Sequence, residues 1–167
     1  PARIYPTRLR GSSWQTTTSY SDSGLSPNKC YGYTVTARDS LLNTGTASGI
    51  SSTYTGANTP GTPTLSGATA STLNLTNSEN SNPASSPTTN FAVQVVTTTP
   101  SDATWLTKWV NASGAPSDTA VWLTDAQLDA LVLQGLQTST LYGVKAKARN
   151  QDSDETPLSA EGQGTTS

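Results

Sequence analysis

The sequence predicts an all-β protein made of small sandwiches, each with two packed sheets. Of the 167 residues, 12% are charged and 32% hydrophobic, while serine and threonine are abundant. That composition suits strands with one apolar face and one hydroxyl-lined face better than charged helices. Two further observations support the prediction: apolar residues that alternate with polar ones, and an internal repeat.

The internal repeat sets the number of domains. The segment from Gly24 to Asp39 aligns without gaps on the segment from Gly135 to Asn150, and the two are 111 residues apart. In each copy, residues two apart are apolar, which is the period of a strand. These residues are Tyr31, Tyr33, Val35 and Ala37 in the first copy, and Tyr142, Val144, Ala146 and Ala148 in the second. We expect one half-buried strand in each copy.

A leucine stands six residues before the first tyrosine of each copy. This spacing lets the leucine end one strand and a short loop turn the corner. The tyrosine ring then enters the core while its hydroxyl bonds back to the loop backbone. We therefore expect tyrosine corners at Tyr31 and Tyr142.

The repeated motif reads Gly-Leu, a tyrosine six residues later, and then Ala-Arg-Asp or Ala-Arg-Asn. It resembles the E–F corner and F strand of bacterial fibronectin type III domains. Residues 82–84, 91–95 and 149–156 are similar to the surroundings of strands C and F–G in such domains. The resemblance implies immunoglobulin-like β-sandwiches in tandem.

The resemblance departs from the family pattern at strand B. Asn77 stands where many such domains place a core tryptophan. Trp105, Trp109 and Trp122 are the candidates to fill that space.

Residues 54–63 contain glycine and proline and show no alternation, which predicts a linker. We expect residues 1–57 to be the C-terminal half of a fibronectin type III-like domain, strands C′ to G, and residues 58–167 to be a complete one. In the first, residues 3–5 resemble a C′ strand and residues 14–20 the E region. Half a sandwich exposes an apolar face and strand edges, so we expect completion by upstream chain or by another subunit.

Short strands of the second domain are expected near residues 64–66, 72–76, 90–98, 104–110, 120–123, 131–133, 141–149 and 158–164. Between two of them, residues 125–131 have apolar side chains three apart after a possible cap at Thr124 or Asp125. That pattern predicts a short helical turn.

Several function classes are excluded by composition. The absence of histidine removes Ser-His-Asp triads, histidine-ligated zinc and imidazole acid–base catalysis. With a net charge of −2 and no basic cluster beyond Arg3, Arg8 and Arg10, nucleic acid is not an expected partner. No apolar run approaches the ~20 residues that span a bilayer. We expect no enzyme activity, catalytic residue, cofactor or membrane span.

Two groups of residues are weaker binding candidates. Asp152, Asp154 and Glu155 in the predicted F–G hairpin could offer oxygens to calcium, although a solvated loop is favoured over a metal site. Trp105 and Trp109, four residues apart, are expected to share a strand face. Core or interface packing is favoured for them over a platform that stacks sugars. Cys30 is expected to be buried and inert.

The sequence therefore favours a structural or adhesion module of a secreted or cell-surface protein, with a subunit of an extracellular assembly as a candidate setting. The expected partners are neighbouring domains of the same longer chain or adjacent subunits, with glycans as a further candidate. The alternatives are a spacer or carbohydrate-binding module of a secreted polysaccharide-degrading enzyme, and a decoration module of a phage or virion tail. Proteins with many different functions contain sandwich modules of this kind, so the fold alone does not distinguish among these three functions.

Overall fold

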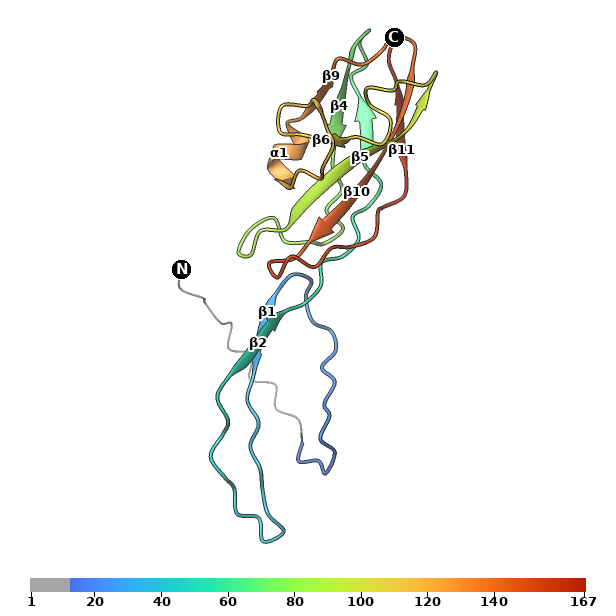
Figure 1. The fold of residues 1–167 in the computed structure, drawn as a ribbon. Coiled ribbons are helices and arrows are strands. Elements are labelled where there is room, and N and C mark those ends of the chain that lie inside the picture. Colours follow the sequence, from blue (N-terminus) through green and yellow to red (C-terminus); the bar gives the residue numbers. More distant parts are fainter. Residues whose placement is uncertain (1–12) are drawn as a thin grey trace.

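The computed structural model describes residues 13–167, so the strand expected at residues 3–5 lies outside the described residues. Figure 1 shows a sandwich formed by the later part of the chain and, below it, an elongated extension formed by the earlier part, with one pair of short strands next to the sandwich. We call this extension, residues 13–57, the ribbon. No helix in the part that the structure describes is long and apolar enough to cross a membrane.

One sheet of the sandwich has three antiparallel strands, in the order β3 (Thr64–Ser66), β4 (Thr72–Thr76) and β9 (Val132–Gln134). Leucines alternate with polar residues along β4, so Leu73 and Leu75 are buried while Asn74 between them is exposed. On β9, Leu133 pairs directly with Leu73. The period of two thus gives this sheet one apolar face.

The other sheet follows the order β11 (Gly162–Thr165), β10 (Leu141–Arg149), β5 (Asn90–Thr99), β6 (Trp109–Val110) and β7 (Pro116–Ser117), and β8 (Leu123–Thr124) also pairs with β5. The two long strands, β5 and β10, pair antiparallel along their whole length, with a bulge between Gly143 and Val144. The strands expected near residues 64–66, 72–76, 90–98 and 141–149 are confirmed.

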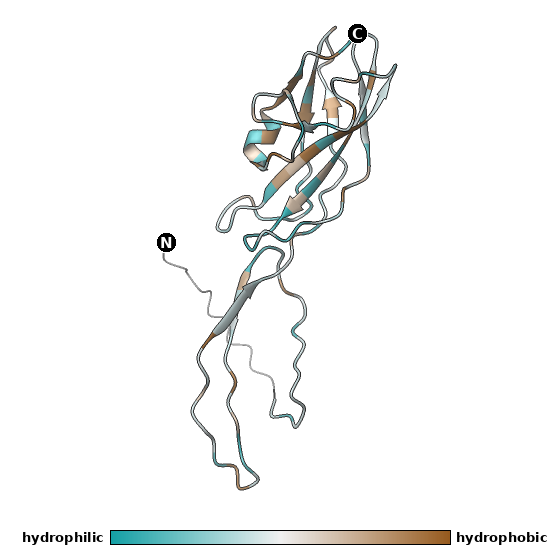
Figure 2. Cartoon of the chain, in the orientation of Figure 1, coloured by the Kyte–Doolittle hydropathy of each residue, from teal (hydrophilic) through white to brown (hydrophobic). Residues whose placement is uncertain are grey.

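The core lies between the two sheets, and Figure 2 shows hydrophobic residues concentrated on β4, β5 and β10. Trp105 is fully buried there, together with Phe91 and Tyr142. Of the three tryptophans that could fill the core, Trp105 is the one that does so, while Trp109 and Trp122 are half-buried outside it.

The expected helical turn is confirmed as α1 (Asp125–Asp129). Thr124 is its N-cap, because the Thr124 hydroxyl oxygen accepts a hydrogen bond from the Gln127 N–H at 3.3 Å. In return, the Gln127 side-chain oxygen accepts from the Thr124 N–H at 2.9 Å. This reciprocal capping box satisfies two donors that a helix start leaves free.

The expected strand over residues 104–110 is wrong for most of its length, because residues 103–107 form turns and only Trp109–Val110 are strand. Asp102 nucleates the turns: its side chain accepts from the Thr104 N–H at 3.0 Å, and its carbonyl accepts from the Trp105 N–H at 3.1 Å. Local hydrogen bonds from an aspartate compete with strand pairing in this way.

The earlier part of the chain forms a sheet of two antiparallel strands, β1 (Cys30–Tyr33) and β2 (Ser51–Tyr54). The expected half-buried strand out to Ala37 is wrong, because β1 ends at Tyr33 and Val35 is 73% exposed. Cys30 is buried and free. Residues 14–20, expected as an E region, contain no strand; at the offset of 111 they correspond to residues 125–131, which hold α1 and the turn after it and precede β9.

Candidate functional site

Both repeated tyrosines bond back to the loop before them. The Tyr31 hydroxyl accepts a hydrogen bond from the Ser26 N–H at 3.0 Å, and the Tyr142 hydroxyl accepts one from the Gln137 N–H at 2.8 Å. In each case the donor lies five residues before the tyrosine. Both hydroxyls therefore fix the loop that leads into the strand, which is the geometry of a tyrosine corner.

The register of the following strands repeats with the same offset of 111 residues. Cys30 pairs with Tyr54 in the ribbon, and Leu141 pairs with Thr165 in the sandwich. The pairing of β1 with β2 thus corresponds residue by residue to that of β10 with β11, although the sequence alignment ended before β2.

Hydrogen bonds from hydroxyl side chains repeat as well. One threonine in each copy accepts from an N–H on the corner and donates to a corner carbonyl. The contacts are Thr55 with Lys29 (2.9 Å) and Ser26 (2.6 Å), and Thr166 with Thr140 (3.0 Å) and Gln137 (2.6 Å). One serine in each copy accepts from a strand N–H: Ser48 from Val35 and Ser159 from Ala146, both at 3.0 Å. These contacts extend the repeat from the corner to the end of each copy.

The two tyrosines differ in one contact. The Tyr142 hydroxyl also donates to the Asp102 carboxylate at 2.6 Å, inside the core. Burial, followed by this carboxylate, raises the pKa of Tyr142 to about 12. The Tyr31 hydroxyl has no carboxylate partner within residues 13–167.

Tyr142→Phe is expected to lower the free energy of unfolding of the sandwich by about 2 kcal/mol, because it removes the hydrogen bond to one oxygen of the buried Asp102 carboxylate, while the other oxygen keeps the Thr104 N–H. Urea unfolding at neutral pH measures this loss. Since the folded state raises the pKa of Tyr142 from 10.0 to about 12, its neutral form stabilises the fold below pH 10. That contribution is lost as the pH rises from 10 to about 12. The difference between wild type and variant should therefore shrink over that range, and a constant difference would contradict this account.

The first corner is held against the sandwich by an asparagine. Asn28 is fully buried with φ +45°, in the left-handed region that asparagine tolerates. Its amide nitrogen donates to the Thr89 hydroxyl at 2.9 Å, and its amide oxygen accepts from the Gln151 N–H at 3.0 Å. One side chain from the ribbon thereby links two loops of the sandwich.

The hairpin after β10 makes the second half of this contact. The Asp152 carboxylate accepts from the Tyr54 N–H at 3.0 Å and from the Thr53 hydroxyl at 3.2 Å. The Asn150 amide donates to the Thr55 carbonyl at 3.2 Å. The end of β2 is thus bonded to the hairpin. We call the contacts of Asn28 and of this hairpin the joint; Figure 1 shows where the ribbon meets the sandwich.

The chain that leaves the joint is also held. Asn58 and Asn82 exchange two hydrogen bonds of 2.8 Å, each between the backbone of Asn58 and the side chain of Asn82. The Asn80 amide donates to the Thr59 carbonyl at 2.8 Å. The linker predicted over residues 54–63 is therefore tied to the sandwich.

The three carboxylates that were candidates for calcium face different partners. Asp152 accepts from the ribbon, as described, whereas Asp154 accepts from the Asn150 amide at 3.1 Å. Glu155 pairs with Lys147 at 2.6 Å. Within residues 13–167, no group of three or more acidic, cysteine or histidine side chains is arranged to hold a metal ion.

Trp105 and Trp109 do not share a strand face as expected, because the turns at residues 103–107 place Trp105 in the core and Trp109 outside it. The Lys147 ammonium lies 4.6 Å from the centre of the Trp109 ring and 5.1 Å from that of Trp122. The Arg149 guanidinium lies 4.5 Å from the Trp122 ring. These are cation–π distances, and they place cations over both outer indoles.

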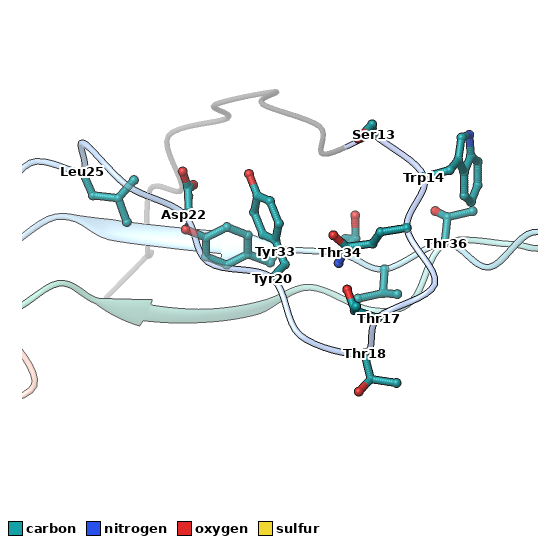
Figure 3. A pocket seen from close by; sticks show the side chains of 12 residues that line it. Ser13, Trp14, Thr17, Thr18, Tyr20, Asp22, Leu25, Tyr33, Thr34 and Thr36 are labelled. Atoms are coloured by element: carbon teal, nitrogen blue, oxygen red, sulfur yellow. Dashed lines mark hydrogen bonds between the residues drawn. The ribbon is translucent and has the colours of Figure 1, made fainter.

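The ribbon carries an open groove of about 820 Å³. Figure 3 shows its lining, in which Tyr20 and Tyr33 lie near Asp22, while Trp14 lies at the other end near Thr36. The Tyr33 hydroxyl donates to the Asp22 carboxylate at 3.1 Å. Burial, together with this carboxylate, raises the pKa of Tyr33. Among the described residues, the exposed large aromatic side chains are Trp14, Tyr20 and Tyr33, and all three line this groove.

The order of the strands decides the fold. A sheet β3-β4-β9 faces a sheet whose order begins β11-β10-β5-β6, and a tyrosine corner lies between β9 and β10. The sandwich is a fibronectin type III-like domain. Sequence comparison adds nothing to this assignment, since no family model matches the chain and neither does any curated protein.

Several solved structures are similar to the chain. One is the fibronectin type-III domain of human fibronectin type III domain containing protein 3, with 22% identity and a TM-score of 0.45 over 71% of this chain and 90% of that one. The d3–d4 domains of the rat CD45 extracellular region have 15% identity and a TM-score of 0.45, over 95% of this chain and 74% of that one. The FN1–FN3 domains of chicken CNTN1 have 15% identity and a TM-score of 0.45, over 88% of this chain but only 45% of theirs.

Proposed function

We propose that the chain is a non-catalytic structural or adhesion module of a secreted or cell-surface protein, in which two fibronectin type III-like domains stand in tandem. Residues 1–57 are the C-terminal half of the first domain and residues 58–167 the whole of the second. The joint carries this proposal. The function of the module is to hold two domains of a longer chain, or of adjacent subunits, in a fixed orientation.

The chemistry of the joint suits that role. Contacts between domains of one chain usually allow relative motion unless they are large and hydrophobic. Here a buried side chain, Asn28, makes directed hydrogen bonds to both sandwich loops, and the hairpin returns bonds to β2. Directed bonds of this kind fix an orientation, because a rotation would leave buried polar groups without partners.

Two properties of the sandwich favour a structural role over binding sugars. Its interior is filled by side chains around Trp105. Lys147 lies over the outer indole of Trp109 and Arg149 over that of Trp122, and a cation on an indole face occupies the surface on which a sugar ring would stack. A structural role uses these residues as they stand.

The test is Asn28→Ala, with Ser139→Ala as the matched control at the equivalent position of the second corner. Residual dipolar couplings would be measured for residues 24–56 and for residues 58–167. In the wild type and the control, one alignment tensor should fit both sets. In Asn28→Ala the two sets should require different tensors, while the sandwich keeps its stability. Separate tensors in the wild type would contradict the proposal.

A further inference from the structure

We propose that the free edge of β1, together with the groove, is the docking surface for a β-strand with the chemistry of β5. The strand comes from the same polypeptide, upstream of the described residues, and carries a carboxylate that accepts a hydrogen bond from the Tyr31 hydroxyl. This inference rests on the proposed division into two domains, but it does not depend on the rigidity of the joint.

The first step is the equivalence of β1 and β10. Strand register, corner bonds and side-chain hydroxyl bonds all repeat at one offset, so each position of β1 has a counterpart on β10. In the sandwich, β10 has β11 on one edge and β5 on the other. In the ribbon, β2 occupies the first of these edges, and no described residue pairs with the second. A free edge offers a row of backbone groups to an incoming strand.

The second step is the apolar face beside that edge. Tyr142, Val144 and Ala146 are all 0% exposed under the second sheet. Of their counterparts, Tyr31 is 8% exposed, Tyr33 38% and Val35 73%. The exposure grows along the strand away from the joint, as expected for a core face that lacks its cover. Figure 3 shows Tyr20 and Tyr33 together on the wall of this groove.

The register of β5 on β10 defines the chemistry of the missing strand. Phe91, Val93 and Val95, two residues apart, pair with Ala148, Ala146 and Val144. Asp102 follows β5 in the chain, and its carboxylate accepts a hydrogen bond from the Tyr142 hydroxyl. The missing strand should therefore alternate apolar residues opposite Ala37, Val35 and Tyr33, and then supply an aspartate or glutamate to Tyr31.

The order of the repeat assigns the source. In the sandwich the covering strand precedes the corner within one polypeptide, and the repeat that we observe contains no insertion. A strand from the same chain also has an effective concentration of about millimolar without any second molecule. Donation by a separate protein and pairing of two copies through this edge are the other outcomes.

The test replaces residues 1–12 with the chain's own second-domain sequence. Residues 58–123 are fused in front of residue 13, because residue 124 is the counterpart of residue 13 in the repeat. Amide hydrogen exchange is then measured at residues 33–37. We expect exchange in the fusion to be slower than in the 167-residue chain by about 100-fold or more, and the fusion to be a monomer.

The carboxylate has its own variants. In the fused segment, the change that corresponds to Asp102→Asn should reverse much of this protection. Combining it with Tyr31→Phe should add little further loss, because the two groups act as one pair. Additive losses would overturn the assignment of a carboxylate to Tyr31.

A fusion with an intact sandwich but fast exchange at residues 33–37 would overturn the proposal. If the fusion does not fold, a synthetic peptide of residues 88–105 is added at millimolar concentration to the 167-residue chain. Protection of the same amides then supports the proposal, and its absence overturns it. A 167-residue chain that is already dimeric and protected at these amides shows that a second copy is the occupant, which also overturns it.

Discussion

Trp105→Ala is expected to lower the free energy of unfolding of the sandwich by about 3–5 kcal/mol. Trp105 is fully buried in the cluster that joins the two sheets, so its removal takes away apolar contacts and leaves a cavity that its neighbours cannot close. The loss is largely independent of hydrogen bonding, because the Trp105 indole nitrogen has no hydrogen-bond partner. Urea unfolding followed by circular dichroism measures it.

Trp109→Ala is the matched control, since the same side chain is removed from the outer face. Trp109 is half-buried and contacts the Lys147 ammonium, so we expect a loss of about 1 kcal/mol. Equal losses for the two tryptophans would contradict their assignment to the core and to the outer face.

Gly114→Ala is expected to lower the free energy of unfolding of the sandwich by about 3–5 kcal/mol. Two costs add: the left-handed backbone conformation, which alanine disfavours, and the steric clash of the added Cβ atom. Gly114 has φ +77°, and a Cβ atom there would lie 1.8 Å from the Val132 carbonyl oxygen. The loop cannot move aside freely, because its Gly114 carbonyl accepts a hydrogen bond from the Gln134 N–H at 2.9 Å. Thermal unfolding of the variant gives the loss.

Gly135→Ala separates the two costs. Gly135 has φ +68°, but nothing lies within 4 Å of the position that its Cβ would take. The variant therefore carries the conformational cost alone, about 1 kcal/mol. If both variants lose the same stability, the close approach of Gly114 to β9 is not what constrains that loop.

Local periodicity in the sequence predicts the strands with one buried face and the short helix. Alternating leucines identify β4, and the apolar residues of β5 and β10 identify the long strands, because a strand with one buried face must alternate. The capping box of α1 was predictable for the same local reason, since Thr124 and Gln127 lie within one turn. The repeated motif also led to the fold, although the alignment alone stopped short of β2.

Contacts between distant residues were not predictable from these patterns. Asn28 and its partner Gln151 are 123 residues apart, and neither belongs to an apolar period. The turns at residues 103–107 depend on Asp102, whose carboxylate bonds both the local backbone and Tyr142 on a distant strand. The strand predicted there does not form, because the local hydrogen bonds of Asp102 stabilise turns more than the spacing of Trp105 and Trp109 stabilises a strand.

The first copy of the motif shows that alternation alone does not produce a buried strand. Its alternation predicts a half-buried strand out to Ala37, but burial needs a second sheet, and no described residue supplies one. Strand β1 is therefore regular next to the joint, where its corner is bonded, and irregular beyond Tyr33. Sequence pattern encodes the capacity to be buried, and tertiary contact decides whether it is realised.

Native-state amide exchange of the 167-residue chain tests most directly whether the ribbon and the end of the sandwich are two copies of one unit. The corner amides of Ser26, Lys29 and Thr55 should be protected, like their counterparts Gln137, Thr140 and Thr166, because each makes the equivalent hydrogen bond. Exchange of the first three at the rate of an unstructured chain, with the second three protected, would contradict the account.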